Sequence, residues 1–268
     1  RHVLEGPFLS NDSADGLGTS GQLVLQEASG ATTGEWSGHK VWPAALALVE
    51  HLHRTRGEAL VGMRVLELGC GLPLVGAALA SLGAEVCSTD HPEVLPHVQE
   101  ALASGGPART GALQGVTAAA RPRLRVRGLA WGAAAGGEAA EGAEAAEGGE
   151  AWRGLSGLCG FEGPVDLLVG ADLVYHDFPL QPLRETLVSA LASHGALAVL
   201  ALQPRSFPMA AALKEPQRIG GFLKSLAAEG EGWGVAVERP GAEARELLGQ
   251  EQVQGLLLAT VTPPKARP

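Results

Sequence analysis

Residues 65–71 read Val65-Leu66-Glu67-Leu68-Gly69-Cys70-Gly71, and a second apolar run ends on Thr89-Asp90. The first run predicts a buried strand that ends in a glycine turn, followed by an amphipathic helix over 74–82 and a second strand over 85–89. Glycines let a turn approach a bound ligand closely, and an acid at the end of the second strand can accept hydrogen bonds from two ribose hydroxyls. The stretch therefore predicts a βαβ unit that binds an adenosine-containing cofactor.

The turn departs from the dinucleotide-binding fingerprint, which needs a third glycine three residues after the second. Here the third glycine is Gly76, two positions late, and Pro73 removes a backbone N–H from the surface that would face a phosphate. Glu67 adds negative charge that suits the ammonium or sulfonium of S-adenosylmethionine better than a pyrophosphate. We therefore favour S-adenosylmethionine as the cofactor; the alternative at this point is an ordinary βαβ turn without a ligand.

Composition narrows the class of protein. The chain has 268 residues, 46% of them apolar, which predicts a single α/β domain over 1–268. The net charge of −9 argues against general nucleic-acid binding and favours a basic substrate. The three cysteines follow no metal-ligand spacing, nor do His91, His97 and His176, so we expect no metal and reduced intracellular thiols.

No apolar stretch reaches the roughly 18–20 residues that span a bilayer, and residues 1–30 lack the apolar region of a signal peptide. We therefore expect a monomer that touches no membrane and resides in the cytoplasm, with the nucleus as the alternative. The sequence begins at Arg1 rather than at Met, so we expect it to be trimmed.

Residues 133–151 form an insert that contains only Ala, Gly and Glu, with an acid at every third position from Glu138 to Glu150. Its glycines disfavour a helix and no apolar stripe exists to bury, so we expect a flexible, solvated insert. The alternative is an acidic surface that recruits a basic partner.

The rest of the chain alternates between strands and helices, after an N-terminal extension over 1–35. Strands are predicted at 23–26, 65–68, 85–89, 124–129, 165–169 and 197–202, with an antiparallel C-terminal pair at 235–238 and 255–261. Helices are predicted at 43–53, 74–82, 92–103, 180–191 and 220–228. Near-continuous apolar strands separated by helices predict a Rossmann-like, doubly wound sheet of seven mostly parallel strands with an antiparallel C-terminal strand.

Polar and aromatic residues collect at the ends of these strands, where open α/β sheets bind ligands. The strand-end residues are Glu67 and Gly69, Asp90, Trp131, and Asp172 with Tyr175. Together with Gly38-His39-Lys40-Val41-Trp42-Pro43 and Gly170-Ala171-Asp172-Leu173-Val174-Tyr175, this order resembles the seven-β-strand methyltransferases of family 16, which mostly methylate lysines in non-histone proteins. The resemblance extends from about residue 22 to residue 262.

The resemblance implies a role for each matching residue. It implies that Trp42, Glu67, Gly69, Cys70, Gly71, Asp90, Trp131 and Ala171 bind the cofactor. It also implies that Asp172 and Tyr175 form an acidic-x-x-aromatic motif that receives the substrate lysine. The asparagines that many relatives carry after the helix over 92–103 are absent here, where the chain reads Leu102-Ala103-Ser104-Gly105.

Three functions follow as hypotheses. The first is an S-adenosylmethionine-dependent methyltransferase that acts on a lysine of a protein substrate. The second keeps the cofactor but methylates arginine or a small molecule; Asp172 lacks the adjacent second acid that arginine methylation typically needs. The third is a catalytically silent, cofactor-binding interaction module, which the intact Glu67, Asp90 and Asp172 disfavour.

Overall fold

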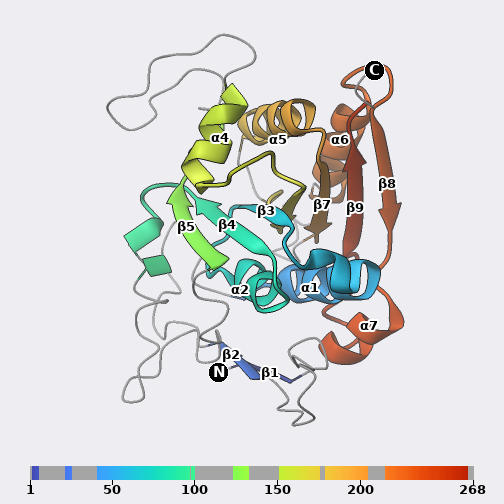
Figure 1. Cartoon of the computed structure of the whole chain (residues 1–268). Coiled ribbons are helices and arrows are strands. Elements are labelled where there is room, and N and C mark those ends of the chain that lie inside the picture. Colours follow the sequence, from blue (N-terminus) through green and yellow to red (C-terminus); the bar gives the residue numbers. More distant parts are fainter. Residues whose placement is uncertain are drawn as a thin grey trace.

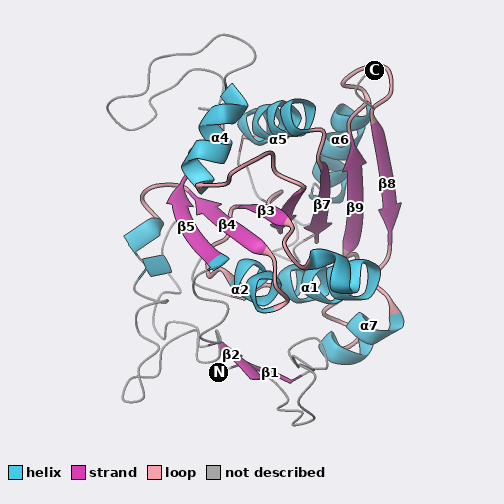
Figure 2. Ribbon diagram, in the orientation of Figure 1, coloured by secondary structure: helices cyan, strands magenta, loops and turns pink. Residues whose placement is uncertain are grey.

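Seven strands form one sheet in the order β5-β4-β3-β6-β7-β9-β8, in a computed structural model (Figures 1 and 2). The structure describes residues 2–5, 22–25, 41–96, 98–99, 123–132, 151–175, 179–204 and 215–264. The strands are β3 (Arg64–Leu68), β4 (Glu85–Asp90), β5 (Leu124–Gly128), β6 (Leu167–Ala171), β7 (Leu197–Leu202), β8 (Gly234–Glu238) and β9 (Leu257–Thr262). All neighbours are parallel except β9, which runs antiparallel to both β7 and β8. The predicted fold class is confirmed.

Helices cover both faces of the sheet. Figure 1 shows α1 (Pro43–Arg56), α2 (Leu74–Ser81) and α7 (Ala242–Leu248) on one face. On the other face lie α4 (Ala151–Cys159), α5 (Leu180–His194) and α6 (Glu215–Ala227). A short 3₁₀ helix, η3 (Gly57–Leu60), joins α1 to β3. Within the described residues, no helix is both long and apolar enough to cross a membrane.

The strands are apolar on both sides because each side of the sheet faces a core. Val65 packs toward α1 and α2, whereas the next residue, Leu66, packs toward α5 and α6. The same alternation separates Leu167 from Leu168 and Val199 from Leu200. Period-two alternation between two cores explains why the strands read as continuous apolar runs.

The binding edge of the sheet follows from the strand order. From β3 the chain builds β4 and β5 on one side, then returns to place β6 and β7 on the other side. The carboxyl ends of β3 and β6 therefore diverge at a point where the strand order reverses. Open α/β sheets bind their ligands at this position.

The structure adds elements that the sequence did not predict. Backbone pairing joins β1 (His2–Glu5) to β2 (Gln22–Leu25), close to the strand expected at 23–26. Ala151, expected to end the insert, begins α4, which buries Leu155 and Cys159 one helical turn apart. Likewise α7 buries Ala244 and Leu248. Each of these helices is too short, or too rich in glycine, to show a clear period in the sequence.

Several predicted helices have other bounds in the structure: the helix expected over 43–53 continues to Arg56, and the one expected over 220–228 begins at Glu215. The helix expected to stop at residue 191 continues to His194, where Gly195 adopts a left-handed φ of 63° and its N–H returns to the Leu191 carbonyl. The helix expected over 92–103 is helical at 95–96 and 98–99, and its remainder lies outside the described residues. His97, His176 and residues 133–150 also lie outside them.

Candidate active site

A cavity of about 390 Å³ opens at the carboxyl ends of β3, β4 and β6. It brings together every residue that the sequence analysis assigned to the site. Its lining includes Trp42, Glu67, Gly69, Cys70, Gly71, Asp90, Trp131, Ala171, Asp172 and Tyr175. The structure thus supports their common location, while the role of each residue stays a prediction.

The glycine turn after β3 needs glycine on steric and conformational grounds. Gly69 has a φ of 60°, and a Cβ at this position would approach the Leu173 Cδ2 atom to 2.7 Å and the Trp131 Cζ2 atom to 3.1 Å. Gly71 has a φ of 49°. Because side chains are excluded here, the backbone of the turn forms part of the cavity wall.

Asp90 ties the end of β4 to this turn. Its Oδ2 atom accepts a hydrogen bond from the Gly71 N–H at 2.7 Å, and its Oδ1 atom accepts one from the His91 N–H at 2.7 Å. Burial raises the pKa of Asp90, and these two hydrogen bonds oppose that shift. Each carboxylate oxygen has a second acceptor site, so Asp90 can still receive ribose hydroxyls from the cavity.

Glu67 is 3% exposed and faces the start of α2. Its Oε2 atom accepts hydrogen bonds from the Ser88 hydroxyl and from the Gly76 N–H, the latter at 3.0 Å. Burial raises the pKa of Glu67 to about 8, despite the opposing effect of these bonds. Burial thus favours the protonated form of Glu67. Through these bonds Glu67 joins β3, β4 and α2 while it lines the cavity, and its predicted role toward the cofactor stays a prediction.

Gly76 does not line the cavity but holds Glu67, which does, although the sequence analysis read Gly76 only as a misplaced third glycine. A Cβ at Gly76 would lie 2.0 Å from the Ser88 Oγ atom and 2.6 Å from the Glu67 Oε2 atom. The late glycine thus makes room for the carboxyl group of Glu67 under the first turn of α2. Glu67 and Gly76 are nine residues apart in the sequence. A glycine at this distance from an acid in a buried strand was the signal from which the sequence analysis could have found the pair.

The start of α2 does not fit a pyrophosphate. Pro73 caps the helix and the Gly76 N–H already donates to Glu67. Phosphate binding at a helix N-terminus uses such N–H groups. The glycine turn and Asp90 instead fit a nucleoside that presents no phosphate to the start of α2.

Two tryptophans form walls of the cavity. Trp42 immediately precedes α1, which begins at Pro43, where the missing N–H of proline costs no hydrogen bond. Trp131 lies in the turn that follows β5, and the next residue, Gly132, donates its N–H to the Thr186 hydroxyl on α5 at 2.9 Å. Both aromatic side chains are half-buried, which is consistent with stacking against an adenine or a cation.

The far end of the cavity follows β6. Asp172 is 5% exposed and is the one non-glycine among the described residues with a positive φ, at 58°. Its N–H donates to the Ala201 carbonyl on β7 at 2.7 Å, which extends the sheet to this residue. Tyr175 is half-buried, three residues further on. Left-handed non-glycine residues cost energy and cluster at functional sites.

Some residues of the cavity escaped the sequence analysis. Val41, Leu129, Pro179 and Pro182 supply apolar walls, and the exposed His91 lies beside Asp90. Apolar lining positions carry no sequence signal that separates them from core residues. In the described part of the chain, no cluster of three or more His, Cys, Asp or Glu residues could hold a metal ion.

Comparison with known proteins agrees with this geometry. A family model described as lysine methyltransferase matches residues 21–135. The human histone-arginine methyltransferase METTL23 is 37% identical over 92 residues, which cover 34% of this chain and 42% of that protein. The mouse EEF1A lysine methyltransferase 3 is 29% identical over 160 residues, which cover 59% and 53%. The chain thus spans about half the length of the curated relatives that it matches.

Solved structures share the fold. The glycopeptide N-methyltransferase MtfA complexed with (S)-adenosyl-L-methionine superposes with a TM-score of 0.50 at 15% identity, over 84% of this chain and 95% of that one. This likeness shows the fold. The match to a methyltransferase family indicates S-adenosylmethionine as the cofactor. The match to the family described as lysine methyltransferase thus covers residues 21–135, less than half of the chain, and the sheet has the seven-stranded, Rossmann-like order.

Proposed function

We propose that the protein transfers the methyl group of S-adenosylmethionine to the side-chain amine of a lysine in a protein substrate. One observation carries this proposal: Asp172 and Tyr175 line the same cavity as the glycine turn and Asp90. A cofactor end and an acceptor end thus meet in one space. The name of the matching family and that of the mouse relative both support lysine as the acceptor.

The residues of the acceptor end suit a lysine amine. S-adenosylmethionine, when bound, supplies an electrophilic methyl group, so the protein must chiefly align the acceptor and exclude water. A free lysine has a pKa near 10.4 and must lose its proton before it attacks. The carboxylate of Asp172 attracts the ammonium on entry, and the apolar Leu173 and Pro179 beside it favour the neutral amine. The Tyr175 hydroxyl, which lines the same cavity, would hold the amine by a hydrogen bond.

Arginine is the second candidate acceptor, because the human relative that matches over 92 residues is named a histone-arginine methyltransferase. Arginine methylation typically needs two acids around the guanidinium, and Asp172 has no acid next to it in the sequence. The other described acids that line the cavity are Glu67, which bonds to α2, and Asp90, which bonds to the glycine turn. The next acid in the sequence is Asp177, which lies outside the described residues.

A comparison of two forms of the protein tests the proposal. The parent protein and the D172N variant are each incubated with a cell lysate and S-adenosylmethionine that carries an isotopically labelled methyl group. Asn tolerates a left-handed φ, so D172N removes the charge without adding backbone strain. We expect labelled proteins with the parent alone, and tandem mass spectrometry should place the label on lysine.

Each other outcome identifies a different function. A label on arginine would show that arginine, and not lysine, is the acceptor. If the D177N variant then lost this label, the result would support an arrangement in which two acids hold the guanidinium. A labelled small molecule would exclude a protein substrate. No labelled product, with cofactor binding intact by calorimetry, would make the protein a silent interaction module.

A further inference from the structure

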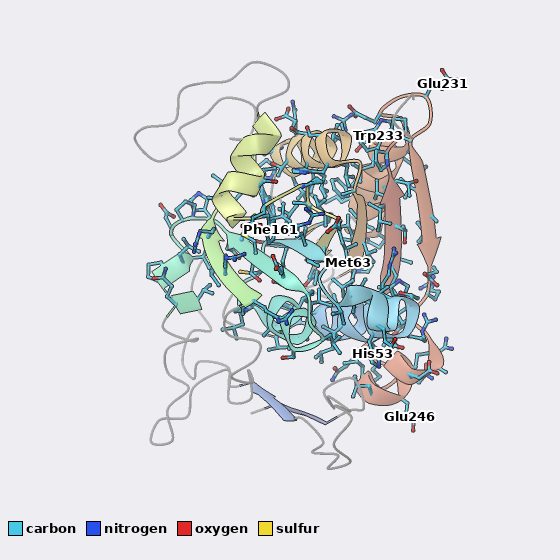
Figure 3. The ribbon with its side chains drawn as sticks, viewed as in Figure 1. His53, Met63, Phe161, Glu231, Trp233 and Glu246 are labelled. Carbon is cyan, nitrogen blue, oxygen red and sulfur yellow. The ribbon has the colours of Figure 1, made fainter. Side chains whose placement is uncertain are left out.

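Leu173 connects the two ends of the cavity. It follows Asp172 in the sequence, is 3% exposed and lines the cavity. It also belongs to the core cluster that holds Phe161, on the face of the sheet that α4, α5 and α6 cover (Figure 3, where Phe161 is labelled). Because interiors are closely packed, a side chain that is part of both the core and the cavity wall can transmit a displacement from one neighbour to the next.

Two glycines leave the space that the Leu173 side chain occupies. A Cβ added at Gly69, in the turn after β3, would lie 2.7 Å from the Leu173 Cδ2 atom. A Cβ added at Gly170 would lie 2.5 Å from its Cδ1 atom and 3.2 Å from its Cγ atom. Gly170 pairs with Leu68 on β3, so the two glycines lie on neighbouring strands. Leu173 thus packs on the backbones of both β6 and the glycine turn.

Gly170 is required by this contact and not by its own backbone. It lies inside β6, paired with β3 and β7, and its φ is not positive. Glycine weakens the interior of a strand and often marks a place where another group approaches closely. Beyond Leu173, the next atom near a Cβ at Gly170 belongs to Leu200, at the ordinary contact distance of 3.5 Å. The glycine therefore serves the close approach of Leu173.

The same contact bears on the conformation of Asp172. This residue has a left-handed φ of 58°, and the residue after it, Leu173, lies back on Gly170 of the strand that the chain has just left. A left-handed non-glycine residue is unfavourable on its own and persists where the surrounding structure enforces it. The buried side chain of Leu173 supplies such an enforcing contact. If Leu173 leaves its place, the carboxylate of Asp172 moves with it.

We infer that Leu173 is a positioning residue, which holds the Asp172 carboxylate in register with the glycine turn. Gly69 contacts Leu173 through space and Asp172 is joined to it through the chain, so a shift of the turn changes the place of the carboxylate. In methyl transfer the acceptor must be aligned with the methyl group, and a misplacement of about 1 Å can cost about a hundredfold in rate. The inference rests on the proposed function for the role of Asp172 toward the acceptor.

Hydrogen exchange tests the coupling without any acceptor. The reporter is the Val174 N–H, because Val174 is 1% exposed and does not line the cavity. In the parent, saturating S-adenosylmethionine should slow the exchange of this amide at least about threefold, because the held turn also holds Leu173. The L173V variant lacks both Cδ atoms. Its Val174 N–H should exchange about tenfold faster than in the parent and should not respond to the cofactor.

Leu226 on α6 provides the matched control, because it is fully buried in the same core cluster and does not line the cavity. L226V removes the same group from the core but should leave the exchange of the Val174 N–H, and its response to the cofactor, as in the parent. L173M keeps the length of the side chain and should restore both. A parent amide that does not respond to the cofactor would overturn the inference, as would equal behaviour of L173V and L226V.

A steric variant approaches the same contact from the strand. In G170A the new methyl group meets Leu173 at short range, so this change should speed the exchange of the Val174 N–H as L173V does. In the double variant G170A/L173V the shorter side chain makes room for the methyl group, so exchange should be no faster than in G170A. Additive effects of the two changes would contradict a shared contact and overturn the inference.

Turnover separates positioning from cofactor binding. With labelled S-adenosylmethionine and a cell lysate, L173V should transfer methyl groups about tenfold more slowly than the parent, while the calorimetric affinity for the cofactor changes by less than about twofold. In the D172N background the same change should cost little, because Leu173 acts through Asp172. A further tenfold loss in that background would overturn the inference. If the parent transfers no methyl group to any acceptor, the proposed function fails, and hydrogen exchange still decides whether Leu173 couples the two ends.

Discussion

The two ends of the cavity are built in different ways. At the cofactor end, Gly71, Asp90, Glu67 and Gly76 hold one another through hydrogen bonds that join β3, β4 and α2. At the acceptor end, Asp172 donates its N–H to the Ala201 carbonyl on β7 and has a left-handed backbone, with a φ of 58°. The family match, residues 21–135, includes the first set and stops before the second.

This difference indicates which end is general and which is specific. Every member of a cofactor-dependent family must bind the same nucleoside, so the cofactor end can be fixed by local backbone geometry. The acceptor end must suit a particular substrate, and here it depends on a single strained residue that follows β6. Substitutions at the two ends should therefore affect different measurements.

The largest effect should come from the acceptor end. We expect D172N to lower the rate of methyl transfer at least about a hundredfold, which corresponds to about 2.7 kcal/mol. The charge that guides the ammonium is lost while the backbone is kept. Affinity for S-adenosylmethionine, measured by calorimetry, should change by no more than about tenfold, or 1.4 kcal/mol.

The matched variant at this end is Y175F, which keeps the ring and removes the hydroxyl. It should weaken methyl transfer less than D172N does, because one neutral hydrogen bond is worth less than a buried charge. Near-normal turnover in both variants would remove the pair from the catalytic site and break the distinction between the two ends.

The largest effect on stability should come from the cofactor end. In G76A the new methyl group meets the Ser88 hydroxyl and the Glu67 carboxyl, so we expect the free energy of unfolding to fall by roughly 2–4 kcal/mol. Urea denaturation measures this loss. G220A in α6 is the control, because nothing lies within 4 Å of a Cβ there, and it should be stabilising by about 0.5–1 kcal/mol. Equal effects of the two changes would show that Gly76 is not sterically required.

Much of the fold follows from the sequence because its strands are buried on both faces. Continuous apolar runs predict β3, β4, β6 and β7 within two residues of their observed bounds. Among the elements that were missed are the helices α4 and α7, which bury only a few residues and form because the sheet and α1 are already there to cover. Tertiary packing, and not local propensity, decides such short helices.

A smaller effect is expected on cofactor affinity when the acceptor of the ribose hydroxyls is removed. D90A should weaken S-adenosylmethionine binding by about 1–3 kcal/mol, the range for polar groups left unpaired. It also releases the Gly71 N–H, so part of the loss reflects a looser turn. The exposed Glu93 offers the control E93Q, which should leave the calorimetric affinity unchanged. Undiminished affinity in D90A would contradict the assignment of Asp90.

The sequence predicted which residues lie together at the cavity, because they stand at strand ends, where the apolar pattern of each strand stops. The pairing of Glu67 with Gly76 and Ser88 was not predicted, since it depends on how α2 lies against β3 and β4. The effect of burial on the protonation of Glu67 could not be predicted for the same reason. A carboxyl group that is charged in the unfolded chain at neutral pH favours its neutral form once it is buried, because burial raises its pKa.

The protonation of Glu67 predicts a dependence of stability on pH. Its pKa is about 8 in the folded protein, above the ordinary value of 4.5. The folded state therefore binds a proton that the unfolded state has lost between these two values, and this contribution to stability falls as pH rises from about 4.5 to about 8. The slope is at most about 1.4 kcal/mol per pH unit. Denaturation of the parent and E67Q from pH 5 to pH 8.5 should show that the stability of the parent falls more steeply than that of E67Q, and parallel curves would contradict the raised pKa.

The smallest effect should follow removal of residues 133–150, which lie in sequence between the Trp131 turn and α4. Replacing them by a Gly-Ser linker should change the free energy of unfolding by less than about 1 kcal/mol, because they contain only Ala, Gly and Glu and offer no apolar stripe to bury. Affinity for S-adenosylmethionine should stay unchanged, since Gly132 keeps its bond to Thr186 and so holds Trp131 in place. Urea denaturation and calorimetry on the same preparation measure both quantities. Loss of cofactor affinity without loss of stability would make the segment part of the cofactor end, and an unfolded protein would show that it contributes to the core.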